Sequence, residues 1–231
     1  MEQRSVNASG DVRLHVGVSG SGPDVLVLSG VPGCVHYLAQ DGLVPDDMRA
    51  WCPEPRGVGR SDGGAHTMAQ AVEDLERIRC SASIDCWTVL GHSWGSDLAV
   101  RYALDHPEAV TSVVGVAGHG LHKDRSWSQR YTSRTEPDPE IPREPVVWQS
   151  LQESILEWIH EPRLFRQLAD SPVPMKFLAA GDDIRPAWPL RQLAELVPRG
   201  SFEVVEHVPH NFWHSHPDTW KRVVTAACLP E

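Results

Sequence analysis

The feature that most constrains this chain is the pentapeptide at residues 91–95, which reads Gly-His-Ser-Trp-Gly and fits the pattern G-x-S-x-G. It follows an apolar, β-rich run at 86–90 and precedes a segment with helical spacing at 94–104. A serine between two glycines at a strand-to-helix turn is held in a strained conformation that exposes its hydroxyl group. The pattern therefore predicts a sharp turn that presents Ser93 as a nucleophile.

Segments with strand-like and helix-like patterns alternate along the rest of the chain. Apolar or alternating runs predict strands at 12–18, 25–28, 48–52, 110–117, 175–180 and 202–205. Helical spacing predicts helices at 67–79, 189–197 and 218–227. This alternation favours an α/β fold with a mostly parallel central sheet flanked by helices. The strand at 12–18 alternates with polar residues and is expected at an antiparallel edge.

The alternation is interrupted between residues 118 and 171. Four prolines punctuate a polar stretch there, and an apolar-periodic segment follows at 146–160. We interpret 119–171 as an inserted helical lid on a single core formed by residues 1–118 and 172–231, since 231 residues suit one domain. The alternative is one long surface excursion with a packed helix.

A serine hydroxyl needs a base to become a useful nucleophile, and that base needs an orienting carboxylate. Asp182 and Asp183 follow the strand at 175–180, where ligands of open α/β sheets bind. His210 follows the next strand after a short loop. We therefore predict Ser93, Asp183 and His210 as catalytic residues, with Asp182 as the alternative acid. The alternative bases are His207, His214 and His216.

The negative oxygen that forms during such an attack needs two backbone N–H donors. The candidates are the amide of Trp94, directly after the nucleophile, and the amide of Val31, in the glycine-rich loop after the strand at 25–28. A short lid would also supply an apolar entrance for a substrate. The candidate substrate-binding residues are Trp127, Trp148 and Trp158.

The composition excludes several other classes of function. A formal net charge of −10 offers no basic surface for nucleic acid or anionic lipid. Five cysteines without paired close spacing indicate neither a disulfide framework nor a zinc site, and a reducing cytoplasm fits them best. No signal-peptide core and no apolar run of about 18 residues is present in the sequence, so secretion and membrane association are not expected.

Four separated blocks resemble the α/β-hydrolase superfamily, and within it the proline iminopeptidase-like branch. Residues 29–33 (Ser-Gly-Val-Pro-Gly) resemble its H-G-G-P-G loop, and residues 55–61 (Pro-Arg-Gly-Val-Gly-Arg-Ser) resemble its D-x-R-G-x-G-x-S segment. The other blocks are 91–95, and 181–186 with His210 beyond. Residues 29, 55 and 209 depart from the branch, which usually has histidine, aspartate and glycine there.

The resemblance implies the α/β-hydrolase fold, a triad of Ser93, Asp183 and His210, and an oxyanion hole formed by the Val31 and Trp94 amides. Related branches that act on haloalkanes and epoxides use an aspartate nucleophile, and the serine at position 93 argues against them. Peptidases of the proline iminopeptidase-like branch have a larger lid with acidic residues that bind the substrate's amino terminus. Glu153 and Glu157 could do so here, but an exposed acidic helix face is the simpler interpretation.

We therefore expect a serine hydrolase that cleaves a small, hydrophobic carboxylic ester, or a related thioester or lactone, through an acyl-enzyme on Ser93. The mechanism needs a small-molecule acyl substrate and no metal or organic cofactor. The alternative within the enzymes is a proline iminopeptidase-like aminopeptidase. A ligand-binding module without catalysis, or a cofactor-free lyase, could use the same fold.

Overall fold

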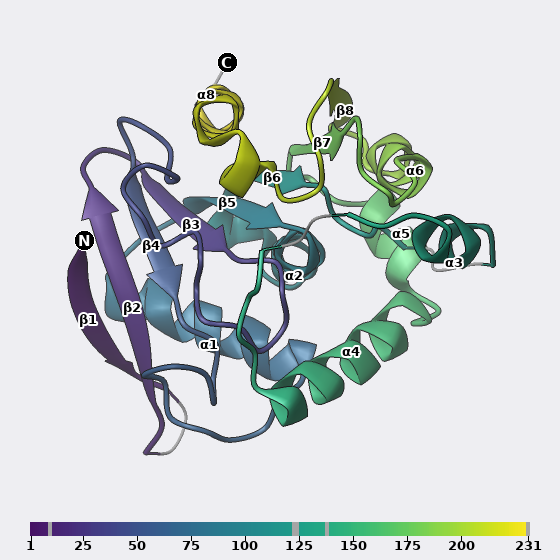
Figure 1. Cartoon of the computed structure of the whole chain (residues 1–231). Helices are drawn as coiled ribbons and strands as arrows, with labels where there is room; N and C mark the ends of the chain where they lie inside the picture. Colours follow the sequence, from purple (N-terminus) through teal and green to yellow (C-terminus); the bar gives the residue numbers. More distant parts are fainter. Residues whose placement is uncertain (9–10, 122–124, 137–138, 230–231) are drawn as a thin grey trace.

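The computed structural model describes residues 1–8, 11–121, 125–136 and 139–229, and its centre is a twisted eight-stranded sheet (Figure 1). The strand order is β1-β2-β4-β3-β5-β6-β7-β8. β2 pairs antiparallel with β1 and with β4, and every later neighbour is parallel. The predicted mostly parallel α/β sheet is thus confirmed. The strands are β1 (Glu2–Asn7), β2 (Arg13–Gly20), β3 (Asp24–Leu28), β4 (Arg49–Pro53), β5 (Trp87–His92), β6 (Val110–Val116), β7 (Met175–Ala180) and β8 (Gly200–Val205).

Helices cover both faces of this sheet. α1 (Met68–Ser81), α2 (Trp94–Asp105) and α6 (Trp188–Leu196) bury their apolar sides against one face, whereas α8 (Pro217–Cys228) packs on the other (Figure 1). Thr67 caps α1, because its side chain accepts a hydrogen bond from the Gln70 amide. Two short helical segments complete the core: η1 (Pro107–Ala109) and α7 (Phe212–Ser215).

The two sides of the core follow from the period-2 alternation of the strands. In β3, Leu26 and Leu28 pack with α1 and α2, while Val25 and Val27 pack with α8. All four side chains are buried. A strand buried on both faces reads as a continuous apolar run, which is why β3 was recognisable in the sequence.

The antiparallel edge differs from the sequence-based prediction. β2 lies between β1 and β4, so the edge strand is β1. Five of the six residues of β1 are exposed, and its sequence Glu-Gln-Arg-Ser-Val-Asn has no apolar alternation. β1 forms because its backbone pairs with β2 over six residues, from Glu2 opposite Val18 to Asn7 opposite Arg13. Sequence periodicity could not reveal a strand of this kind.

The described part of the segment 119–171 contains three helices outside the sheet layers. They are α3 (Arg125–Thr132), α4 (Pro145–Ile159) and α5 (Leu164–Ala169). α4 packs on α1, and its buried residues are Val147, Leu151, Ile155 and Trp158. Before α4 the chain runs back across the molecule, where Arg143 forms an isolated antiparallel bridge with Cys34. None of the described helices is long and apolar enough to cross a membrane.

One buried histidine in the core gives an expected pH dependence of stability. Burial lowers the pKa of His36 from 6.5 to about 4, although its hydrogen bond to the Val27 carbonyl (2.7 Å) opposes this shift. Because the folded-state pKa is the lower one, the unfolded chain binds an extra proton below pH 6.5. We expect the free energy of unfolding to fall by about 2 kcal/mol between pH 8 and pH 5 from this residue.

Urea unfolding at both pH values measures the effect. His36→Gln, whose side-chain amide can still donate to Val27, should show a smaller difference between the two pH values than the wild type. The exposed His216 provides the control, since His216→Gln should retain the full difference. An identical pH dependence in His36→Gln and wild type would show that His36 does not cause it.

Candidate active site

Ser93 stands at the turn between β5 and α2, with φ 52° and ψ −122°. A non-glycine residue rarely adopts a positive φ, and the flanking glycines explain how the turn is tolerated. A Cβ atom on Gly95 would lie 2.6 Å from the carbonyl oxygens of Leu28 and Ser29, and one on Gly91 would collide with the Gly95 carbonyl. The Ser93 amide donates to the Val116 carbonyl (2.8 Å), which ties the turn to β6.

His210 and Asp183 lie beside this serine. His210 Nε2 is 3.0 Å from Ser93 Oγ, and His210 Nδ1 is 2.6 Å from Asp183 Oδ2. A carboxylate accepts hydrogen bonds only, so the Nδ1 atom carries the proton and Nε2 is left to accept one from the serine hydroxyl. The structure thus brings together the three residues that were predicted as catalytic, from the ends of β5, β7 and β8.

The alternative acid and the alternative bases do not take part in the hydrogen bonds that link Ser93, His210 and Asp183. Asp182 directly precedes Asp183, but its side chain is exposed to solvent. The other histidines of this region are also exposed, whereas His210 and Asp183 are buried. The exposed alternatives are His207, His214 and His216.

Asp183 is held in its charged form. Burial alone would raise its pKa, but the charges of His210 and Arg185, together with hydrogen bonds from both, lower the pKa of Asp183 to about 2. The Arg185 main-chain amide and its Nη1 atom both donate to Oδ1, at 2.8 and 3.0 Å. Since the folded-state pKa is the lower one, this carboxylate stabilises the fold above about pH 4, and the contribution is lost as the pH falls towards 2.

The two predicted oxyanion residues flank Ser93. Trp94 is the first residue of α2, where helix geometry leaves the amide without an intrahelical acceptor. Val31 lines the same cleft as Ser93, in a loop that approaches so closely that a Cβ on Gly30 would lie 2.6 Å from Ser93 Cβ. The Gly30 amide already donates to the Tyr37 hydroxyl (2.5 Å), so Val31 is the better placed donor of the two.

Ser93 and His210 open onto a cleft of about 890 Å³. Two of the three predicted tryptophans, Trp127 and Trp148, line it. Trp158 does not: it is 3% exposed and packs in the core, with Arg101 5.9 Å from its ring centre. Ten residues place Trp158 about 15 Å further along α4 than Trp148, where it packs in the core with Leu151 and Ile155, so the prediction for Trp158 is corrected.

A buried polar network behind the site was not predicted. His92 Nε2 donates to the main-chain carbonyl of His210 (3.0 Å), so its Nδ1 accepts from the Tyr37 hydroxyl (2.6 Å). Burial and then the nearby charge of His210 lower the pKa of His92 well below its usual value, and burial raises that of Tyr37. Both residues therefore stay neutral and hold the loop that carries His210. In the sequence, His92 occupies a position where the pattern G-x-S-x-G allows any residue, so the pattern did not point to a role for it.

A second histidine–carboxylate pair also faces the cleft. His119 lines it, and the Nδ1 atom of His119 is 2.8 Å from Asp97 Oδ2. Asp97 lies one turn after Ser93 in α2 and is 2% exposed. Its other oxygen accepts the Gly120 amide (3.2 Å). The sequence offered no signal for this contact, because the two residues are 22 positions apart on separate elements.

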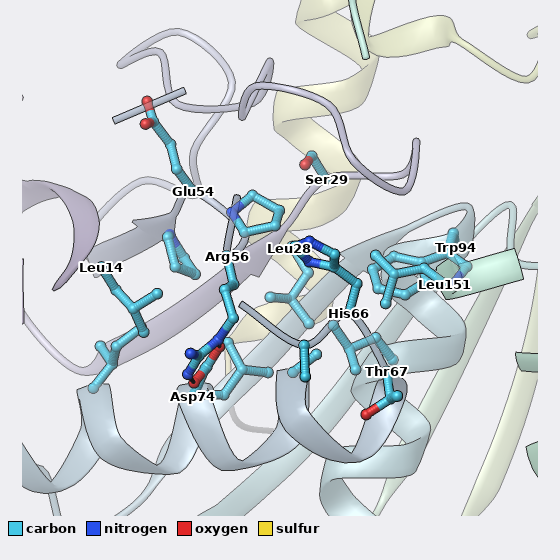
Figure 2. Close-up of a pocket in the computed structure, with 17 residues that line it drawn as sticks. Leu14, Leu28, Ser29, Glu54, Arg56, His66, Thr67, Asp74, Trp94 and Leu151 are labelled. Carbon is cyan, nitrogen blue, oxygen red and sulfur yellow. Dashed lines mark hydrogen bonds and ion pairs between the residues drawn. The ribbon is translucent and has the colours of Figure 1, made fainter. Parts of the chain in front are cut away.

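A smaller cavity of about 60 Å³ lies on the other side of the loop at residues 29–33 from the cleft (Figure 2). Ser29 and Trp94 border it from above and from the side, and Arg56 forms a buried ion pair at its base with Asp74 of α1. It shares no lining residue with the cleft. Ser93 therefore lines the large cleft and not this cavity. Within the described residues, no group of three or more His, Cys, Asp or Glu side chains could hold a metal ion.

Comparisons with known proteins identify the family of this fold. The family model of the alpha/beta hydrolase fold matches residues 23–154, more than half of the chain. The chain is 36% identical over 128 residues to a proline iminopeptidase of Xylella fastidiosa, and 30% identical over 132 residues to an epoxide hydrolase 2 of Siraitia grosvenorii. These matches cover 51% and 54% of this chain, but only 40% and 42% of the relatives.

Among solved structures, a thermophilic esterase from Thermogutta terrifontis superposes with a TM-score of 0.75 at 15% identity, over 98% of both chains. This likeness shows that the whole architecture is shared. Together with the family match and the turn at Ser93, it leads to one conclusion. The chain belongs to the α/β-hydrolase family.

Proposed function

We propose that this chain is a serine hydrolase that cleaves small, hydrophobic carboxylic esters, or related thioesters or lactones, through an acyl-enzyme on Ser93. The observation that carries the proposal is the hydrogen-bonded row of Ser93, His210 and Asp183 on the wall of a large cleft. A nucleophile, a base and an orienting carboxylate in this order are the groups that acyl transfer requires.

In the first step, the Ser93 hydroxyl proton passes to His210 Nε2 while Oγ bonds to the acyl carbon. The carbonyl electron pair moves onto oxygen, and the amides of Val31 and Trp94 stabilise this charge. Collapse breaks the bond to the leaving group, which takes the proton from His210. Water then gives a proton to His210 and attacks the acyl carbon. Breakage of the acyl bond to Ser93 Oγ releases the acid, and Oγ takes the proton back from His210. Asp183 stabilises the imidazolium formed in both halves.

We propose that the segment 119–171 acts as the lid of the cleft. It contributes Trp127 and Trp148 to the lining, together with Tyr131, whose ring stacks on Trp127 at 5.3 Å. Aromatic walls favour an apolar acyl or alcohol group. The proposed role in substrate binding is therefore restricted to Trp127 and Trp148.

The amino-terminus site considered for the aminopeptidase alternative does not lie at the cleft. Glu153 and Glu157, the two acidic residues considered for binding an amino terminus, are exposed on α4 and do not line the cleft. The Siraitia grosvenorii relative is named an epoxide hydrolase, and the resemblance gives that branch an aspartate nucleophile. Position 93 is a serine here, which supports acyl transfer.

Labelling with a fluorophosphonate tests the proposal. The wild type should be modified at Ser93, as located by peptide mass spectrometry, and His210→Ala should react far more slowly. Turnover of a 4-nitrophenyl ester should exceed that of a prolyl arylamide. Stoichiometric ligand binding by an unlabelled, inactive protein would favour the binding module instead, and a cleaved C–C bond would favour the lyase.

The two tryptophans of α4 should respond differently to substitution. Trp148→Ala removes a cleft wall that is 37% exposed, so we expect a KM for apolar esters raised several-fold with little change in the melting temperature. Trp158→Ala leaves a cavity in the core and should cost about 3–5 kcal/mol of unfolding free energy, while KM stays near the wild-type value. Thermal melts and initial-rate kinetics on both variants measure this. The reverse pattern would mean that Trp158, and not Trp148, contacts the substrate.

A further inference from the structure

A carboxylate from the segment 119–171 reaches the main chain of the base. Glu136 Oε1 accepts the main-chain amide of His210 (2.6 Å), and Oε2 accepts Arg185 Nη1 (3.0 Å). The Glu136 side chain is 4% exposed, although it lies 74 positions before His210 in the sequence. Burying a carboxylate is costly unless its oxygens are paired, and here each oxygen has one donor.

Arg185 connects this carboxylate to the acid of the triad. Its Nη1 atom lies 3.0 Å from both Glu136 Oε2 and Asp183 Oδ1, and its side chain is 11% exposed. The guanidinium carbon lies 5.1 Å from the ring centre of Tyr131, which belongs to α3. Two residues of the inserted segment, Glu136 and Tyr131, therefore hold the arginine that holds Asp183.

We propose that Glu136 is a positioning residue for His210, and that it makes the placement of the base depend on how the segment 119–171 is seated. This inference rests on the proposed hydrolase function. Among the described residues, the hydrogen-bond partners of His210 are Ser93 and Asp183 at the ring, His92 at the main-chain carbonyl and Glu136 at the main-chain amide. Of these four, only Glu136 comes from the inserted segment. Moving that segment away would release His210 and remove one of the two acidic partners of Arg185.

Glu136 also affects the charge that His210 meets during the reaction. The charged and titratable groups around His210 are Asp183, Arg185, Glu136 and His92. Because His92 is neutral, the two carboxylates and the guanidinium together carry a net charge of −1. Replacing Glu136 by glutamine brings this to zero, so the imidazolium that forms in the transition state is less stabilised. The same loss disfavours protonation of the resting base, and activity should therefore persist to lower pH.

The test uses Glu136→Gln, Glu136→Asp and Glu136→Ala in the full chain, with a 4-nitrophenyl ester. We expect Glu136→Gln to lower kcat about 10-fold with KM within about twofold, and to move the acid limb of the kcat/KM profile down by about half a pH unit. Glu136→Asp keeps the charge, so its acid limb should stay in place although kcat falls. Glu153→Gln makes the same charge change on an exposed site of α4 and should match the wild type.

Hydrogen exchange of the His210 amide gives a readout that does not need turnover. Its protection should fall in Glu136→Ala and stay unchanged in Glu153→Gln. The proposal is overturned if Glu136→Gln equals the wild type in kcat and acid limb, or if kcat falls with the acid limb unmoved, which would indicate general loosening. An inactive wild type whose exchange still responds to Glu136 would refute the hydrolase and leave the contact established.

Discussion

Ser93→Ala is expected to lower kcat for ester hydrolysis by about 10⁴- to 10⁶-fold, with no change in fold. The substitution removes Oγ, the atom that lies 3.0 Å from His210 Nε2, and no other described hydroxyl group lies on that nitrogen. The backbone bonds of the turn, such as the one from the Ser93 amide to Val116, do not involve the side chain and remain. Burst kinetics and fluorophosphonate labelling measure the loss.

The matched control for this experiment is Ser96→Ala. Ser96 is buried one turn further along α2, and its hydroxyl has no hydrogen-bond partner in the described residues. It should keep wild-type kcat and label at Ser93 as before. If Ser93→Ala retained more than about a hundredth of the wild-type kcat, attack by Ser93 could not be the main route.

Asp183→Asn is expected to lower kcat by about 10³- to 10⁴-fold. The asparagine side chain can turn its amide towards His210 Nδ1, which would place the imidazole proton on Nε2 and leave no acceptor for the Ser93 hydroxyl. KM should change little, because Asp183 does not line the cleft. Steady-state kinetics on purified, folded variants measure this effect.

Asp182→Asn makes the identical chemical change one residue earlier and should leave kcat within about twofold, since Asp182 is solvent-exposed. The pair of variants decides between the two acids that the sequence left open. A large loss of kcat in Asp182→Asn, with Asp183→Asn still active, would mean that Asp182 is the acid. The loop after β7 would then need a conformation different from the one described.

The fold could be predicted where local pattern and tertiary environment agree. Strands β3, β5 and β7 are buried along most of their length and appear in the sequence as mostly apolar runs. α2 follows a turn whose glycines are required by close backbone contacts. β1 and the short helices α5 and α7 were missed, because their formation depends on pairing or packing with distant segments rather than on periodicity.

The same distinction applies to the candidate site. Ser93, Asp183 and His210 could be proposed because each follows a recognisable strand in the order that the chemistry requires. Tyr37, Glu136 and Arg185 could not, since their roles arise from single contacts between residues far apart in the chain. Trp158 was misassigned because aromatic composition carries no information about whether a side chain lines a cleft or packs in the core.

The positive φ of Ser93 has a consequence for how this protein can change. A serine held in that region of backbone space costs on the order of 1–3 kcal/mol, whereas glycine adopts it without the Cβ penalty. Selection for thermal stability therefore favours glycine at position 93, whereas selection for turnover favours serine. On the proposed mechanism, selection for the reaction keeps a serine at position 93, and a descendant released from that selection would gain stability by replacing Ser93 with glycine.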